Sequence, residues 1–218
     1  MTSRATRWRL EAIQAFDRLK LRRLAQRHPG VVLHPESSSN LASARFELGP
    51  GARLEIGARV YTERRSRGVH FAIAEGARVE IGEDTWLRSD IAPVLIFAFP
   101  GAHIRIGREG FLNGCHLSAK ASIEIGDRVW IGMGSRILDA DQHDLDADHR
   151  EGIEPIRIGN HCWIAADVTV LRGVEIGEQS VVGTRSTVTR SLPAHALAFG
   201  SPAVMSTRAI GDRTRLSI

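Results

Sequence analysis

Aromatic residues and cysteines are scarce in this 218-residue chain. Aromatic side chains make up 6% of the residues although hydrophobic residues reach 43%, so a folded core must consist mainly of Ile, Val, Leu and Ala. The two cysteines, Cys115 and Cys162, are too few for a disulfide framework and form no CxxC pair. We therefore expect both to be small buried thiols.

Long hydrophobic runs are also missing. The most apolar stretch, residues 91–99, is much shorter than the ~20 residues of a membrane-spanning helix and contains Pro93. We interpret it as an apolar insertion. The early arginines Arg4, Arg7 and Arg9 are not followed by an apolar segment, so they do not resemble a secretory signal, and we expect a cytoplasmic protein.

The net charge of +4 is unevenly distributed along the chain. Residues 1–30 hold eight basic and two acidic residues, a balance of +6, which leaves −2 for the remaining chain. A nucleic-acid-binding fold would carry its basic residues on the folded body, so no nucleic-acid partner is expected.

Residues 6–27 show the spacing of a basic amphipathic helix that ends at His28-Pro29-Gly30. The predicted apolar arc consists of Leu10, Ile13, Phe16, Leu19 and Leu24, with Arg7, Arg18 and Arg22 opposite. Two interpretations remain open. Either the helix caps the end of the next element, as repeat arrays require, or it rests on an anionic membrane surface.

The strongest pattern is a six-residue repeat between residues 158 and 188. A branched aliphatic residue recurs at every sixth position, at Ile158, Ile164, Val170, Ile176, Val182 and Val188. Neither an α-helix nor an uninterrupted strand has this period, whereas a short strand followed by a tight turn does. A second inward position holds small or β-branched residues, at Cys162, Val168, Val174, Ser180 and Ser186. Together they predict an all-β solenoid with a narrow core.

Ile-Gly pairs extend the repeat towards the N-terminus. They occur at residues 56–57, 81–82, 106–107, 125–126, 158–159 and 176–177, spaced by three hexads with insertions. The largest insertion lies between Ile137 and Ile158, and long loops on rigid scaffolds often carry function. The expected organisation is a basic helix and linker in residues 1–45, a solenoid domain in 46–205 with an active-site loop at 139–155, and a tail in 206–218.

Five motifs, in chain order, resemble the left-handed parallel β-helix (hexapeptide-repeat) acyltransferases. They are Leu112–Ala119, His143-Asp144-Leu145-Asp146 with Arg150, Asn160–Ala165, Thr189–Pro193 and Gly200–Ala203. The first resembles the exopolysaccharide O-acetyltransferase branch, and the others resemble the maltose and galactoside O-acetyltransferases. Ala165 and Thr184-Arg185 depart from the family pattern, which usually has Gly and Ala-Gly at these places.

The resemblance implies a left-handed parallel β-helix with three strands per coil, and acetyl transfer from the co-substrate acetyl-CoA to a saccharide hydroxyl. It further implies a homotrimer with active sites between subunits, and no metal. His143 would be the general base of a direct transfer, facing Trp163 of the next subunit. An alcohol needs a base near neutral pH, and the unperturbed histidine pKa of about 6.5 suits this task.

The binding residues follow from the same resemblance. The coenzyme A set is Trp163 beside the pantetheine arm, Ala165, Ala166, Gly183 and Thr184 along it, and Thr189 and Arg190 near the nucleotide phosphates. The expected acceptor set is Asn113, His116 and Asp141. For Asn113 and His116, satisfied turn residues are an equal alternative.

Other functions remain open. An N-acyltransferase acting on an amino sugar would share the cofactor, a γ-class carbonic anhydrase would use His143, His149 and His161 as metal ligands, and a solenoid scaffold would not catalyse. Within the favoured class, a polysaccharide or lipid-linked saccharide is the preferred acceptor. The motif at 113–119, the basic helix and the apolar segment at 91–99 all suit work near the inner membrane face.

Overall fold

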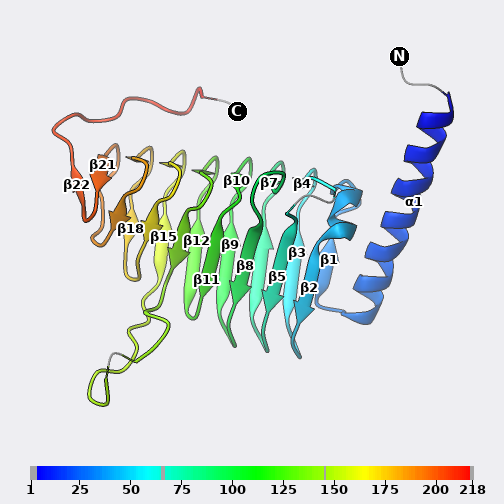
Figure 1. The fold of residues 1–218 in the computed structure, drawn as a ribbon, viewed down its shortest axis with the longest axis horizontal. Helices are drawn as coiled ribbons and strands as arrows, with labels where there is room; N and C mark the ends of the chain where they lie inside the picture. The colour runs from blue at the N-terminus through cyan, green and yellow to red at the C-terminus, as the bar shows by residue number, and fades with distance from the viewer. Residues whose placement is uncertain (1–3, 65–66, 145, 217–218) are drawn as a thin grey trace.

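In the computed structural model, the chain forms one parallel β-helix with an α-helix at one end. The structure describes residues 4–64, 67–144 and 146–216. Figure 1 shows the coils stacked side by side, with α1 (Arg4–Arg27) at the N-terminal end of the stack and the C-terminal tail running back along it. A long loop extends from the stack in the C-terminal half.

The stacked coils form a triangular prism whose three walls are β-sheets, which we name A, B and C. Sheet A contains β1 (Val31–Leu33), β3 (Arg53–Ile56), β6 (Arg78–Ile81), β9 (His103–Ile106), β12 (Ser122–Ile125), β15 (Ile156–Ile158) and β18 (Glu175–Ile176). Sheet B contains β2 (Arg45–Leu48), β5 (Val69–Ile73), β8 (Val94–Ala98), β11 (His116–Ala119), β14 (Arg136–Leu138), β17 (Thr169–Val170) and β20 (Thr187–Val188). Sheet C contains β4 (Tyr61–Thr62), β7 (Trp86–Arg88), β10 (Phe111–Asn113), β13 (Trp130–Ile131), β16 (Trp163–Ile164), β19 (Val181–Val182), β21 (Leu197–Gly200) and β22 (Ala203–Met205).

The strands visit the sheets in the order A, C, B, so every full coil turns three corners. We call these corners the A–C, C–B and B–A edges. At the A–C edge, one non-glycine residue per coil takes a positive φ of 50° to 59°: Arg59, Asp84, Glu109, Arg128, His161 and Gln179. This left-handed conformation makes the tight turn that joins two short strands.

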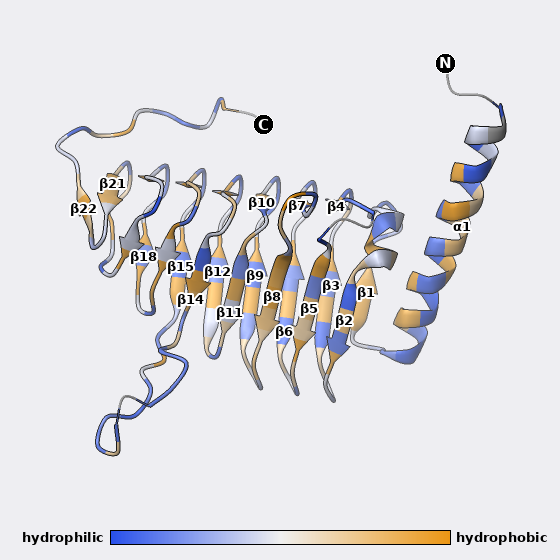
Figure 2. Cartoon of the chain, in the orientation of Figure 1, coloured by the Kyte–Doolittle hydropathy of each residue, from blue (hydrophilic) through white to orange (hydrophobic). Residues whose placement is uncertain are grey.

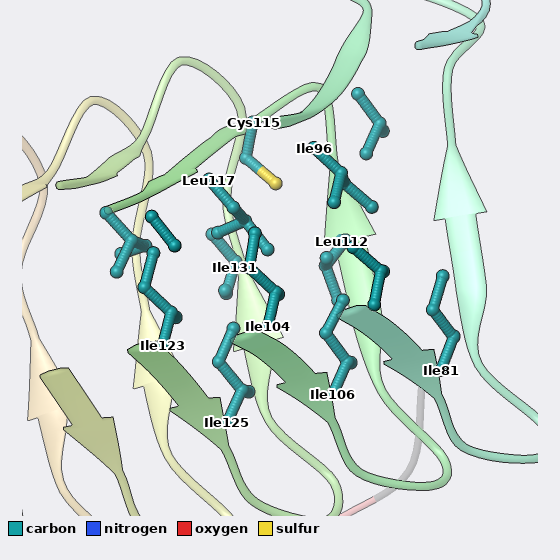
Figure 3. Close-up of a cluster of buried hydrophobic side chains, with 14 of the residues drawn as sticks. Ile81, Ile96, Ile104, Ile106, Leu112, Cys115, Leu117, Ile123, Ile125 and Ile131 are labelled. Atoms are coloured by element: carbon teal, nitrogen blue, oxygen red, sulfur yellow. The ribbon is translucent and has the colours of Figure 1, made fainter. Parts of the chain in front are cut away.

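The core consists of stacked aliphatic side chains. The isoleucines of the Ile-Gly pairs lie directly in register down sheet A, at Ile56, Ile81, Ile106, Ile125, Ile158 and Ile176. Each of them is at most 3% exposed. Figure 3 shows how such side chains from the different walls point into the prism and meet there. The six-residue period is therefore confirmed as the pattern of the inward side chains.

The glycine of each Ile-Gly pair allows the coils to approach closely at the A–C edge. A Cβ atom added to Gly82 would lie 2.6 Å from the amide nitrogen of Arg108 and 2.7 Å from the carbonyl oxygen of Gly107. Contacts this short with backbone atoms cannot be relieved by a side-chain rotation. The pair thus combines one residue that fills the core with one that lets the next coil stack.

The helix α1 ends at Arg27, as predicted, and its C-terminal half packs on β1 and the 3₁₀ helix η1 (Ser39–Ser43). Asp17 is 2% exposed and its carboxylate accepts a hydrogen bond of 2.7 Å from Nε of Arg64. The buried Leu21 marks the same side of the helix. This contact is the capping arrangement that the sequence left open.

Two expectations about apolar segments are wrong. The predicted arc of α1 does not pack as one face: Leu24 packs against the core, whereas Leu10, Ile13, Phe16 and Leu19 are 39–58% exposed. Residues 91–99 are not an insertion, because Val94–Ala98 forms the regular strand β8 with Val94 and Ile96 in the core. Among the described residues, no helix is long and apolar enough to cross a membrane.

Candidate active site

The loop at residues 139–155 leaves the prism between β14 and β15, at the B–A edge (Figure 1). The start of the loop is anchored to the preceding coil by Asp139, which is fully buried. The Asp139 carboxylate accepts hydrogen bonds of 2.7 and 2.8 Å from the backbone N–H groups of Lys120 and Ala121. Burial raises the pKa of Asp139, and these backbone hydrogen bonds oppose the rise.

Lys120 connects the two arms of the loop. Its ammonium group lies 2.7 and 2.8 Å from the Glu151 carboxylate oxygens and donates to the Gln142 carbonyl at 3.3 Å. The Lys120 and Glu151 side chains are 19% and 17% exposed, so solvent screens this ion pair less than a fully exposed one. Because Gln142 precedes His143, Lys120 fixes the backbone next to the predicted base.

On the other side of the loop, Arg172 binds Asp141 and Glu154. Nε of Arg172 donates to one carboxylate oxygen of Asp141 at 2.8 Å, and the N–H of Gly152 donates to the other at 3.0 Å. The Arg172 guanidinium lowers the pKa of Asp141. Both oxygens of this predicted acceptor residue therefore already serve the architecture of the loop.

His143 itself is exposed, and its ring makes no hydrogen bond, ion pair or ring contact with any residue that the structure describes. The second histidine of the loop differs, because Nδ1 of His149 lies 2.8 Å from a carboxylate oxygen of Asp146. Leu145, which belongs to the motif around His143, lies outside the described residues. The loop thus presents the imidazole of His143 without a partner among the described residues. The two ends of the loop are held by Asp139, Lys120 and Arg172.

The C–B edge collects most of the predicted binding residues. From the N-terminal side, this edge carries Asn113 and His116, then Ala165 and Ala166 two coils further on, and Gly183 and Thr184 in the next coil. Backbone hydrogen bonds connect the corners along the edge: Gly134 N–H to Gly114 O at 2.9 Å, Asp167 N–H to Met133 O at 2.8 Å and Arg185 N–H to Ala166 O at 3.0 Å. The predicted acceptor pair and the predicted path of the pantetheine arm therefore share one line on the prism.

Two polar atoms on this edge lack partners. Oδ1 of Asn113 and Nε2 of His116 are buried and make no hydrogen bond with the described residues. Burial, and then the charge of Arg136, lowers the pKa of His116, so its ring stays neutral near pH 7. The ring also packs edge-on against Phe97 with centroids 5.1 Å apart. Buried unpaired polar atoms are costly, and a bound ligand is one way to satisfy them.

The structure does not bring Thr189 and Arg190 to the C–B edge. They are exposed and follow β20, where the chain leaves sheet B towards the B–A edge. Arg185, one of the departures from the family pattern, is exposed on the C–B edge with a φ of 60°. Gly134 takes a positive φ of 76° at the corresponding corner two coils earlier.

Trp163 points outward from sheet C and is 42% exposed. The Arg213 guanidinium of the C-terminal tail lies over this indole at 5.7 Å and over that of Trp130 at 5.4 Å. Nε of Arg213 also donates to the His161 carbonyl at 3.0 Å, and burial lowers the pKa of this arginine. Sequence reasoning missed Arg213, since no motif marks the tail and its contacts come from distant coils.

The structure also places the two cysteines and the three histidines that a metal site would use. Cys115 and Cys162 are buried, as predicted, and burial raises the pKa of Cys115 to about 12 and that of Cys162 to about 11. Neither thiol is a nucleophile in this state. Among the described residues, no group of His, Cys, Asp or Glu side chains is arranged to hold a metal ion. His161 lies at the A–C edge, away from the loop with His143 and His149.

Comparisons with known proteins agree with this architecture. The model of the bacterial transferase hexapeptide (six repeats) matches residues 155–190. A colanic acid biosynthesis acetyltransferase by name, WcaF of Escherichia coli K12, is 55% identical over 103 residues, covering 38% of this chain and 57% of the relative. A Staphylococcus aureus (strain COL) protein, also an acetyltransferase by name, is 50% identical over 64 residues, covering 28% of this chain and 32% of the relative. The chain thus spans about a third to three-fifths of these relatives.

Among solved structures, the polysialic-acid-specific acetyltransferase NeuO superimposes with a TM-score of 0.66 and 25% identity, over 77% of this chain and 71% of that one. The polysialic acid O-acetyltransferase OatWY, at 20% identity and a TM-score of 0.51, shares the fold. The chain is therefore a left-handed parallel β-helix built from hexapeptide repeats, with an N-terminal α-helix. Its resemblance to the hexapeptide-repeat acetyltransferases, predicted from the motifs, is confirmed.

Proposed function

We propose that this protein is an acetyl-CoA-dependent O-acetyltransferase that modifies a hydroxyl group of a saccharide. The observation that carries the proposal is the exposed imidazole of His143, which has no partner among the described residues, on a loop that Asp139 and Lys120 hold to the prism. A polymeric or lipid-linked saccharide is the favoured acceptor. In support, NeuO is named for polysialic acid, a polymer, and WcaF for colanic acid biosynthesis.

In this proposal, His143 removes the proton from the acceptor hydroxyl as its oxygen attacks the thioester carbonyl of acetyl-CoA. The carbon–oxygen bond forms and gives a tetrahedral oxyanion, which then collapses with cleavage of the carbon–sulfur bond. The protonated imidazole returns the proton to the departing thiolate. The acetyl group moves directly in this proposal, as the resemblance to the family implies, and the buried thiols of Cys115 and Cys162 are not placed to carry it as a thioester.

The substrates would occupy the C–B edge and the neighbouring face of sheet C. Trp163 flanks the pantetheine arm, and the arm follows the backbone at Ala165, Ala166, Gly183 and Thr184. Thr189 and Arg190, which follow β20 towards the B–A edge, would bind the nucleotide phosphates only if the nucleotide end of coenzyme A crosses sheet B. Among the acceptor residues, Asn113 and His116 have the stronger support, since each offers a buried polar atom that no described residue pairs with. Asp141 would have to share its carboxylate with Arg172 and Gly152.

The proposal includes a homotrimer in the cytoplasm. Within one chain, the His143 loop leaves the B–A edge, whereas Trp163 faces outward from sheet C. Sheet B separates the loop from the C–B edge, so one prism does not close a site around both groups. A second copy that places its His143 loop against Trp163 would complete the site, and cyclic symmetry would repeat this contact three times.

The direct test is thiol release from acetyl-CoA with a panel of mono- and oligosaccharides, including amino sugars. We expect acceptor-dependent release that falls on the order of 10²-fold or more in His143→Ala. The matched control is His149→Ala on the same loop, whose imidazole is paired with Asp146 and should affect the rate little. Equal rates in wild type and His143→Ala would refute the general base, and acetylation of amino groups alone would replace the O-acetyltransferase with an N-acyltransferase.

A further inference from the structure

The N-terminal helix α1 has two sides with different surroundings, one packed on the coils and one exposed. One side faces the first two coils, as the Asp17–Arg64 ion pair and the buried Leu21 show. Since an α-helix advances about 100° per residue, Trp8, Phe16 and Leu19 lie on roughly the opposite side. These three side chains are 70%, 58% and 43% exposed. The capping contact therefore leaves an outward apolar face on the same helix.

Arginines border this outward face on both flanks. By the same helical geometry, Arg9 lies along one flank and Arg22 along the other, whereas Arg23 lies within the face, near the C-terminal end of the helix. All three are exposed, and none forms an ion pair with the part of the chain that the structure describes. Residues 1–30 hold eight basic and two acidic residues, a balance of +6. One of the acidic residues, Asp17, forms an ion pair with Arg64 on the inner side of the helix.

We propose that the outward face of α1 docks the protein on an anionic lipid surface. An apolar stripe with a tryptophan and a border of arginines is the pattern of helices that lie in the membrane interface. Free guanidinium groups complement the negative headgroups of anionic lipids, and a purely apolar partner would leave these charges unused. Figure 2 shows apolar and polar residues interleaved along α1, and Figure 1 shows no other described element on its outer side.

The position of α1 sets the geometry of this docking. The helix covers the N-terminal end of the prism (Figure 1), so the coils would extend from the lipid surface with the C–B edge left open. In the proposed homotrimer, on which this step rests, three-fold symmetry places three such helices at one level along the axis. Three weak contacts to one surface bind much more tightly than a single one. Lipid-linked acceptors would then be held near the active sites.

The test is flotation of the full-length protein with vesicles, without acetyl-CoA, so that its outcome is independent of the proposed activity. One vesicle set is purely zwitterionic and the other contains phosphatidylglycerol. We expect binding to the anionic vesicles and loss of it at high salt. The variant Trp8→Ser/Phe16→Ser should bind at least about tenfold more weakly, as should Arg9→Gln/Arg22→Gln/Arg23→Gln. The control Val32→Ser/Val204→Ser removes apolar residues that are 59% and 62% exposed elsewhere and should bind like wild type.

Several results would overturn the proposal. One is a wild-type protein that floats with neither vesicle set, and another is equal binding by wild type and Trp8→Ser/Phe16→Ser. A change of oligomeric state in that variant, measured by light scattering, would instead identify a second copy of the chain as the occupant of the face. Because the altered side chains are exposed, circular dichroism should show all variants folded. Thiol release with a soluble acceptor should also be unchanged in them.

Discussion

The His143 loop and the C–B edge are built in opposite ways. The loop is an insertion held by side-chain charges, through Lys120 with Glu151 and Arg172 with Asp141. The edge is regular and held by backbone hydrogen bonds from one coil to the next, while polar atoms of Asn113 and His116 stay unpaired within the described part of the chain. A reactive group can thus be positioned on an insertion without changing the scaffold, whereas the proposed binding surface is part of the scaffold itself.

The largest effect that separates the two regions is expected from Lys120→Met. Without the ammonium group, Gln142 and Glu151 lose their common partner and His143 loses its fixed backbone. Misplacing a reactive group by about 1 Å can cost up to about 10²-fold, so we expect kcat to fall about 10- to 100-fold while KM for acetyl-CoA stays nearly constant. Steady-state kinetics measures both values. Recovery in Lys120→Arg is the control, and a rise of KM at unchanged kcat would contradict the positioning role.

On the C–B edge, Asn113→Leu should have a smaller effect with the opposite kinetic pattern, a change of KM and not of kcat. Removing a buried carbonyl oxygen that has no partner should stabilise the fold by up to about 1 kcal/mol, as measured by denaturant unfolding. The same change removes a candidate acceptor contact, so KM for the acceptor should rise about tenfold with kcat little changed. If the acceptor KM stayed the same, Asn113 would be part of the turn and not of the binding surface.

The smallest expected effect is a pH dependence of the stability that is due to His116. Its pKa in the folded state lies below the unfolded value of about 6.5, because burial and Arg136 disfavour the charged ring. Above that unfolded value both states are neutral and stability is unaffected. As the pH falls below it, the unfolded chain binds the proton first, so the free energy of unfolding decreases. The melting temperature should therefore drop more between pH 7.5 and 5.5 in wild type than in His116→Gln, and equal drops would contradict this assignment.

The inward pattern of the fold could be predicted from the sequence because it is local. A residue such as Ile158 or Val182 repeats every six positions, and the stacking of coils turns that period directly into a buried row. The exposed position of His143 could likewise be anticipated, since a long insertion and a motif coincide there, whereas its role as the general base stays a prediction. The cysteines were predicted as buried for the same reason, because both occupy inward positions.

What the sequence could not reveal depends on distant contacts. The burial of one side of α1 follows from its docking through Asp17 to Arg64, which lies in the second coil. Residues 91–99 were mistaken for an insertion because both faces of β8 are apolar, with Leu95 and Phe97 outward, so the alternation that marks a strand is lost. The tail residue Arg213 reaches Trp163 only after the chain has run back along the coils.

The most direct test of the account is to mix two variants, His143→Ala and Trp163→Ala, after separate purification and reversible dissociation. Each variant alone should be nearly inactive. If every site takes His143 from one subunit and Trp163 from the next, random reassembly restores an intact pair at about one interface in four. The account predicts thiol release at about a quarter of the wild-type rate from the reassembled mixture. A mixture no more active than its parents would contradict a site shared between subunits.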